Sequence, residues 1–86
     1  MEHCLDVSEL EPPEPLERIL DALADLPQGD WLRVLHRREP FPLYRMLHDM
    51  GYRWYTRTGP EPGIEMFVWE AGVPVPPEIA REVPVC

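Results

Sequence analysis

The 86-residue chain contains no lysine, so its eight basic residues are all arginines. Chemistry that depends on a lysine nucleophile or on a Schiff base is therefore excluded. Cysteine is also scarce, since Cys4 and Cys86 lie near opposite ends, with no CxxC motif and no third thiol. This pattern fits neither a disulfide scaffold nor a zinc site, and we expect both thiols to be reduced.

Long hydrophobic runs are missing as well. No run approaches the roughly 18 apolar residues that can cross a bilayer, and the first residues have neither the basic nor the apolar region of a secretory signal. We therefore expect a cytoplasmic protein with no membrane partner. The formal net charge of −8 argues against nucleic acid as the main partner, because binding to a phosphate backbone needs a basic surface.

The charge is unevenly distributed along the chain. Residues 31–60 carry six arginines against two acids, Glu39 and Asp49, whereas the thirds before and after them are acidic. Solvated strand and helix faces account for these arginines most simply, and a basic rim that faces an anion is the alternative.

The segment Leu10–Leu26 contains the most regular helical pattern in the chain. Its apolar residues recur at the spacing of a helix with one buried face: Leu16, Ile19, Leu20, Leu23 and Leu26. Pro13 and Pro15 suit a first helical turn, where a missing N–H costs little. A second helix is predicted over Pro40–Met50, with Leu43, Met46, Leu47 and Met50 buried and Gly51 ending it.

Four segments are predicted to be strands. His3–Val7 is a short strand near an edge, Trp31–His36 is almost continuously apolar and suits a central strand, and Tyr52–Thr58 and Ile64–Glu70 form a hairpin. After residue 70 the composition becomes proline-rich, so we expect one domain over residues 1–70 and an extended tail over residues 71–86.

The order strand, helix, strand, helix, hairpin indicates an α/β (α+β) fold. We predict a two-layer βαβαββ sandwich, in which a right-handed crossover places both helices on one face of a four-stranded mixed sheet.

A resemblance to a known group of domains supports this fold. It is carried by Leu5-Asp6-Val7, by Leu10 with Pro13-Glu14-Pro15-Leu16, and by residues 36–44 (HRREPFPLY) with Gly51. The chain resembles an uncharacterised bacterial domain family that is placed beside the TusA/SirA-like sulfur carriers. The resemblance covers about residues 4–70 and implies the same sandwich fold.

The sulfur carriers have a Cys-Pro-x-Pro signature that opens the first helix, and its cysteine carries a persulfide. In this sequence the signature falls on residues 12–15, where both prolines match and Pro12 replaces the cysteine. The resemblance therefore implies the fold, whereas a sulfur relay through that position is chemically impossible.

One candidate ligand site lies between the predicted second strand and the second helix. Open α/β sheets place ligands at such strand ends, and the residues there are His36, Arg37, Arg38 and Glu39. Pro40 and Pro42 remove backbone donors, so an anion would depend on the guanidinium groups. Glu11 and Glu14 are two further candidates, for which helix capping is the simpler explanation.

A second candidate is the sheet face that the helices do not cover. By alternation, Leu32, Val34, Ile64, Met66 and Val68 should face the helices. The opposite face then carries an apolar patch of the size that marks interaction surfaces, formed by Trp31, Leu35, Phe67 and Trp69. Either the tail folds back over this patch, or the chain self-associates or docks on a partner there.

No metal or cofactor is expected. His3 and His36 should lie at opposite ends of neighbouring parallel strands, too far apart to share one ion with His48 or Cys4. Cys86 lies on the tail, with nothing nearby in sequence to lower its pKa.

No stretch of the chain places a nucleophile, a base and an orienting group at a catalytic spacing, so we do not expect an enzyme. We expect a non-catalytic binding or regulatory module that docks on a protein partner through the open sheet face or the rim of the first helix. The alternatives are an accessory role in sulfur transfer or redox metabolism, and binding of a small anionic ligand near His36 and Arg38.

Overall fold

A computed structural model describes residues 1–11, 13–59 and 63–82. Its elements follow the order β1 (Glu2–Asp6), α1 (Glu14–Ala24), β2 (Trp31–His36), α2 (Phe41–Asp49), β3 (Tyr52–Thr58), β4 (Ile64–Glu70) and a 3₁₀ turn, η1 (Pro77–Ile79). The βαβαββ prediction is confirmed. The bounds of β2, β3 and β4 are those predicted, whereas β1 begins and ends one residue earlier than predicted.

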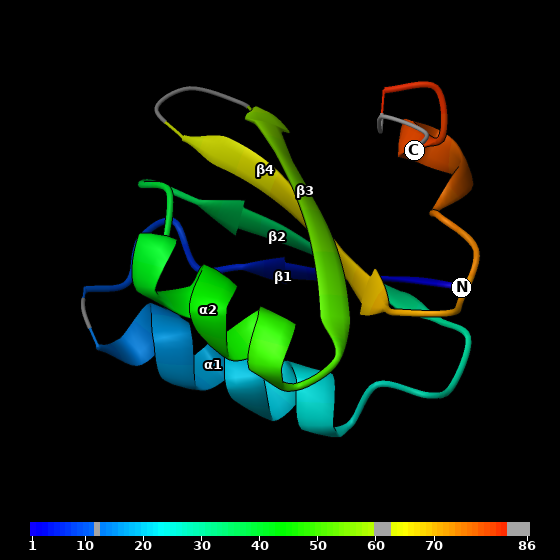
Figure 1. Cartoon of the computed structure of the whole chain (residues 1–86). Coiled ribbons are helices and arrows are strands. Elements are labelled where there is room, and N and C mark those ends of the chain that lie inside the picture. The colour runs from blue at the N-terminus through cyan, green and yellow to red at the C-terminus, as the bar shows by residue number, and fades with distance from the viewer. Residues whose placement is uncertain (12, 60–62, 83–86) are drawn as a thin grey trace.

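The four strands form one mixed sheet in the order β1-β2-β4-β3. β1 and β2 are parallel, and β4 is antiparallel to both β2 and β3. Figure 1 shows α1 and α2 side by side on one face of this sheet, with the C-terminal segment, orange to red, on the other side. The described residues contain no helix of the length and apolarity that crossing a membrane requires.

The main core lies between the sheet and the helices. Ile19 and Leu23 of α1 are fully buried, as are Leu43 and Leu47 of α2. They meet alternate residues of the two central strands, namely Leu32, Val34, Met66 and Val68. These facings agree with the predicted alternation, because register places Leu32 opposite Val68 and Val34 opposite Met66. Leu16, Leu20 and Leu26 are only partly buried at the margin of this core.

The helix ends follow from the local sequence. Each helix has proline in its first turn, where the missing N–H costs no intrahelical bond. After α2 the chain reverses at Gly51, whose φ of +85° is readily adopted only by glycine. Tyr44 then lies flat against Trp54 of β3, with ring centroids 5.2 Å apart, and its hydroxyl is 2.6 Å from that of Thr56. Burial raises the pKa of Tyr44 to about 12.

The opposite face of the sheet has its own small core, which the C-terminal segment covers. Phe67 and Trp69 of β4 are buried beneath Ile79 of η1, with Trp31, Tyr55 and Val75 packed around them. The tail was predicted to be extended, but residues 77–79 form a 3₁₀ turn. Pro76 precedes this turn and Pro77 begins it, where the fixed φ of proline suits a turn. The burial of Ile79 holds the turn against the sheet.

Candidate functional site

The parallel pairing of β1 and β2 brings their carboxyl ends to the same edge of the sheet. The chain leaves β1 for α1 and β2 for α2 at this edge, and the two connections enclose a cleft of about 570 Å³. We call it the strand-end cleft. Its charged and polar wall is formed by Glu11, His36, Arg37, Arg38 and Glu39.

Five of the six residues proposed from the sequence as ligand-binding therefore line one cleft. The sixth, Glu14, is not among the lining residues. It lies exposed in the first turn of α1, where its carboxylate is 3.6 Å from the guanidinium of Arg18. This i, i+4 pair is the helix-stabilising role that was the simpler explanation for Glu14.

His36 is the best-positioned polar group of the cleft. Its Nδ1 accepts a hydrogen bond of 3.1 Å from the backbone N–H of Arg38, so in the neutral ring Nε2 carries the hydrogen and is a donor. Burial lowers the pKa of His36, which favours that neutral form. The side chain thus offers an uncharged donor beside two guanidinium groups.

The backbone around His36 is fixed by close contact with the start of β4. A Cβ at Gly63 would collide with the carbonyl oxygen of His36. Only glycine lets the two backbones approach this closely. Gly63 is therefore a positioning residue of the site that sequence reasoning missed, and its place in a Pro-Gly loop gave no sign of this contact.

Arg37, Arg38 and Glu39 project from the connection between β2 and α2 and are exposed. Within the described residues, neither arginine forms an ion pair. Their positive charges are available at the rim, since a surface guanidinium without a fixed carboxylate partner can bind an anion directly.

The remaining wall of the cleft is apolar. It consists of three leucines and four prolines: Leu10, Leu16, Leu43, Pro13, Pro15, Pro40 and Pro42. Leu43 is completely buried and belongs to the main core, and Leu10 and Leu16 pack at its margin. The floor of the cleft is therefore an extension of the hydrophobic core, and the polar wall lies on one side only.

The apolar patch proposed on the open sheet face is largely buried. Phe67 and Trp69 are 0% and 2% exposed, and Trp31 is partly buried against the same cluster. Leu35 is half-buried and lies outside that cluster. Of the alternatives left open for this patch, the structure contains the one in which the tail folds back over it, so Phe67 and Trp69 do not form an open docking surface.

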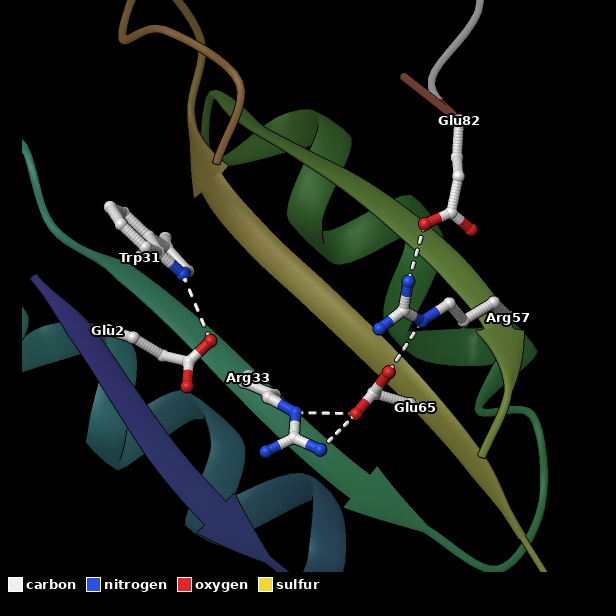
Figure 2. A network of polar contacts seen from close by, with 6 residues as sticks. All are labelled: Glu2, Trp31, Arg33, Arg57, Glu65 and Glu82. Atoms are coloured by element: carbon white, nitrogen blue, oxygen red, sulfur yellow. Dashed lines mark hydrogen bonds and ion pairs between the residues drawn. The ribbon is translucent and has the colours of Figure 1, made fainter. Parts of the chain in front are cut away.

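A network of ion pairs joins this face to the C-terminal segment (Figure 2). Glu65 of β4, only 4% exposed, accepts hydrogen bonds of 2.5 Å from Nε of Arg33 on β2 and from Nε of Arg57 on β3. Arg57 also binds Glu82 of the tail at 2.5 Å, and its guanidinium carbon lies 5.1 Å from the centroid of the Phe67 ring.

The electrostatics of the network favour an ionised Glu65. Burial raises the pKa of this carboxyl, but hydrogen bonds from Arg57 and Arg33, with their positive charges, outweigh burial and leave the pKa below its ordinary value. Both carboxylate oxygens are occupied by arginines. Because Glu65 is buried and each of its oxygens already contacts an arginine, we assign the network a structural role.

The thiols and histidines do not form a site in the described residues. Cys4 is an exposed free cysteine, and no group of three potential metal ligands occurs in the described ranges. His3 is 2.8 Å from Asp30, at the opposite end of β1 and β2 from His36. The proposed role of Cys86 lies outside the described residues.

A comparison with known protein families gives a match. The model of a family described as "Uncharacterized conserved protein (DUF2249)" matches residues 4–70. These residues include every strand and helix from α1 to β4 and most of β1. No curated protein matches the chain, and no solved structure matches it. The match ends where the C-terminal segment begins.

Proposed function

We propose that this chain, which belongs to the DUF2249 family of uncharacterized conserved proteins, is a non-catalytic binding module. Its site is the strand-end cleft. The ligand is a small anion. The observation that carries this proposal is that His36, Arg37 and Arg38 line a single cleft at the carboxyl ends of two parallel strands.

The chemistry of the cleft suits binding better than turnover. Its donors are two guanidinium groups, which bind carboxylates and phosphates in a bidentate manner, and the ring N–H of a neutral His36. The cleft contains no serine, threonine or cysteine to act as a nucleophile among its lining residues. Recognition without a covalent step is the function that these groups support.

The test is a titration followed by NMR of the ¹⁵N-labelled chain with acetate, hexanoate and inorganic phosphate at constant ionic strength. We expect saturable shifts centred on residues 36–39, and we expect the double variant Arg37→Gln, Arg38→Gln to weaken the tightest anion at least about tenfold, the effect of losing one charged hydrogen-bonded contact.

Arg45→Gln is the matched control, because Arg45 is an exposed arginine of α2 that does not line the cleft. It should bind as the wild type does. Shifts that are equal in the control and the double variant, or no saturable shift at residues 36–39 with any of the three anions, would overturn the proposal.

Docking on a protein partner through the rim that the first helix shares with the start of α2 is a second proposal for the same region. It is favoured by Phe41, which is 67% exposed between two prolines that line the cleft. Sedimentation equilibrium tests the simplest case, a second copy of the chain: a mass above the monomer that Phe41→Ser abolishes would support it, and a monomer at every concentration would contradict it.

Two further expectations stay proposals. The scarcity of cysteine supports a cytoplasmic location, which fractionation of cells expressing a tagged chain would test. An accessory role in sulfur transfer could not use the cysteine of the carrier signature, since residue 12 of this chain is proline. Mass spectrometry for a persulfide after incubation with a cysteine desulfurase would test that role.

A further inference from the structure

We infer that the anion taken by the strand-end cleft is an amphiphilic monocarboxylate, a single carboxylate on a hydrocarbon body, rather than an inorganic anion. This inference rests on the proposed function and adds the chemical class of the ligand. It is carried by the division of the cleft into one charged wall and one wall made only of leucine and proline.

The apolar wall is the first part of the evidence. Leu10, Leu16 and Leu43 extend the main core into the cleft. Leu43 is already completely buried, but Leu10 and Leu16 are only partly buried. A small inorganic anion has no surface that can cover these two side chains, so they would stay in contact with water. A hydrocarbon body would bury them, and each methylene that leaves water adds about fourfold to the affinity.

The prolines are the second part. A helix N-terminus usually holds phosphate or sulfate with its free backbone N–H groups. Both helix starts that border this cleft carry proline at two positions, 13 and 15 for α1 and 40 and 42 for α2. Four donors are thereby missing from the place where an inorganic oxyanion would need them, and the side chains of the charged wall must bind the anion instead.

The formal charge of the cleft is the third part. Arg37 and Arg38 contribute two positive charges, and Glu11 and Glu39 contribute two negative charges to the same wall. These formal charges sum to zero, so a second negative charge on the ligand gains little net attraction. A single carboxylate needs only one bidentate guanidinium, and the neutral His36 can donate to it without adding charge.

The test compares ligands that differ in one property each. The series acetate, butyrate, hexanoate varies only the hydrocarbon, hexanamide keeps the hydrocarbon and removes the charge, and inorganic phosphate keeps charge without hydrocarbon. Binding is followed by NMR shifts of residues 36–39 and of the methyl groups of Leu10 and Leu16. We expect the dissociation constant to fall about fourfold per added methylene along the series.

We also expect phosphate to bind no better than acetate, and hexanamide to bind at least about tenfold more weakly than hexanoate. Arg38→Gln should weaken hexanoate and leave hexanamide unchanged, with Arg45→Gln as the silent control. An unchanged melting temperature of Arg38→Gln establishes that the variant is folded.

The outcomes separate the two levels of the proposal. If acetate, hexanoate and phosphate bind with equal affinity and Arg38→Gln weakens all three, the cleft is an anion site and the inference about the hydrocarbon body is wrong. If phosphate binds more tightly than hexanoate, the inference is likewise wrong. If hexanamide matches hexanoate, or nothing binds, both the inference and the proposed function are overturned.

Discussion

Glu65 links three neighbouring strands on the covered face of the sheet. It is buried, and it joins arginines from the strands on either side of β4. A neutral glutamine there would keep the volume but lose both ion pairs, leaving two partly exposed guanidinium groups facing a neutral amide. We predict that Glu65→Gln lowers the free energy of unfolding by about 1–3 kcal/mol at pH 7.

The pH dependence of this effect follows from the lowered pKa of Glu65. A carboxyl whose folded-state pKa lies below its unfolded value stabilises the fold above the unfolded pKa, and this stabilisation disappears as pH falls through the folded value. The difference between wild type and Glu65→Gln in urea denaturation should therefore be largest at about pH 7 and smallest in acid, below the folded-state pKa of Glu65.

Glu70→Gln is a matched control, since Glu70 ends the same strand and forms no ion pair with the described residues. Its variant should differ from wild type by less than about 0.5 kcal/mol at either pH. A difference for Glu65→Gln that stays constant with pH would mean that the loss comes from packing and not from the ion pairs.

At the level of the element, α1 supplies two completely buried side chains, Ile19 and Leu23, whereas Leu20 of the same stripe is only partly buried. We predict that Leu23→Ala lowers the free energy of unfolding by about 2–5 kcal/mol, the usual cost of emptying a buried leucine site. Leu20→Ala should cost distinctly less. Chemical denaturation of both variants measures the contrast, and equal losses would show that the helix is rotated relative to the sheet.

Most of the elements could be predicted because their residues repeat at the period of the element. The alternation in Ile64–Glu70 placed Met66 and Val68 on one face and Phe67 and Trp69 on the other, and the structure confirms both facings. The cluster at residues 36–39 could be placed at a strand end because the apolar run of residues 31–36 identifies β2.

Contacts between elements could not be predicted in the same way. Arg33, Arg57 and Glu65 are charged residues of three predicted strands, but only the strand register brings them together. The contact of Gly63 with His36 likewise depends on how two strand ends approach. The tail carried too many prolines for any regular pattern, so its position is decided by the burial of Ile79 and not by local sequence.

At the level of the whole molecule, the sheet has two unequal cores, one beneath the helices and one beneath residues 71–82. We predict that deleting residues 73–86 exposes Phe67 and Trp69, lowers the free energy of unfolding by about 2–5 kcal/mol through loss of the Ile79 contacts, and makes the protein bind a hydrophobic dye. Thermal melts and dye fluorescence measure both effects.

Two point variants separate loss of the cover from loss of chain length. Ile79→Ser should reproduce most of the destabilisation, whereas Ala80→Ser, at an exposed neighbouring position, should not. A truncated protein with unchanged melting temperature and no dye binding would contradict the packing of the tail on the sheet.

The division of the three tryptophans between the two faces makes the protein its own optical reporter. Trp69, and beside it Trp31, lie under the tail, whereas Trp54 is stacked on Tyr44 on the helix side. Detachment of the tail alone would transfer Trp69 to water and shift the emission to longer wavelength while the environment of Trp54 stayed the same. With Trp54 replaced by phenylalanine, or with Trp31 and Trp69 both replaced, intrinsic fluorescence would follow each face of the sheet separately, without any added label.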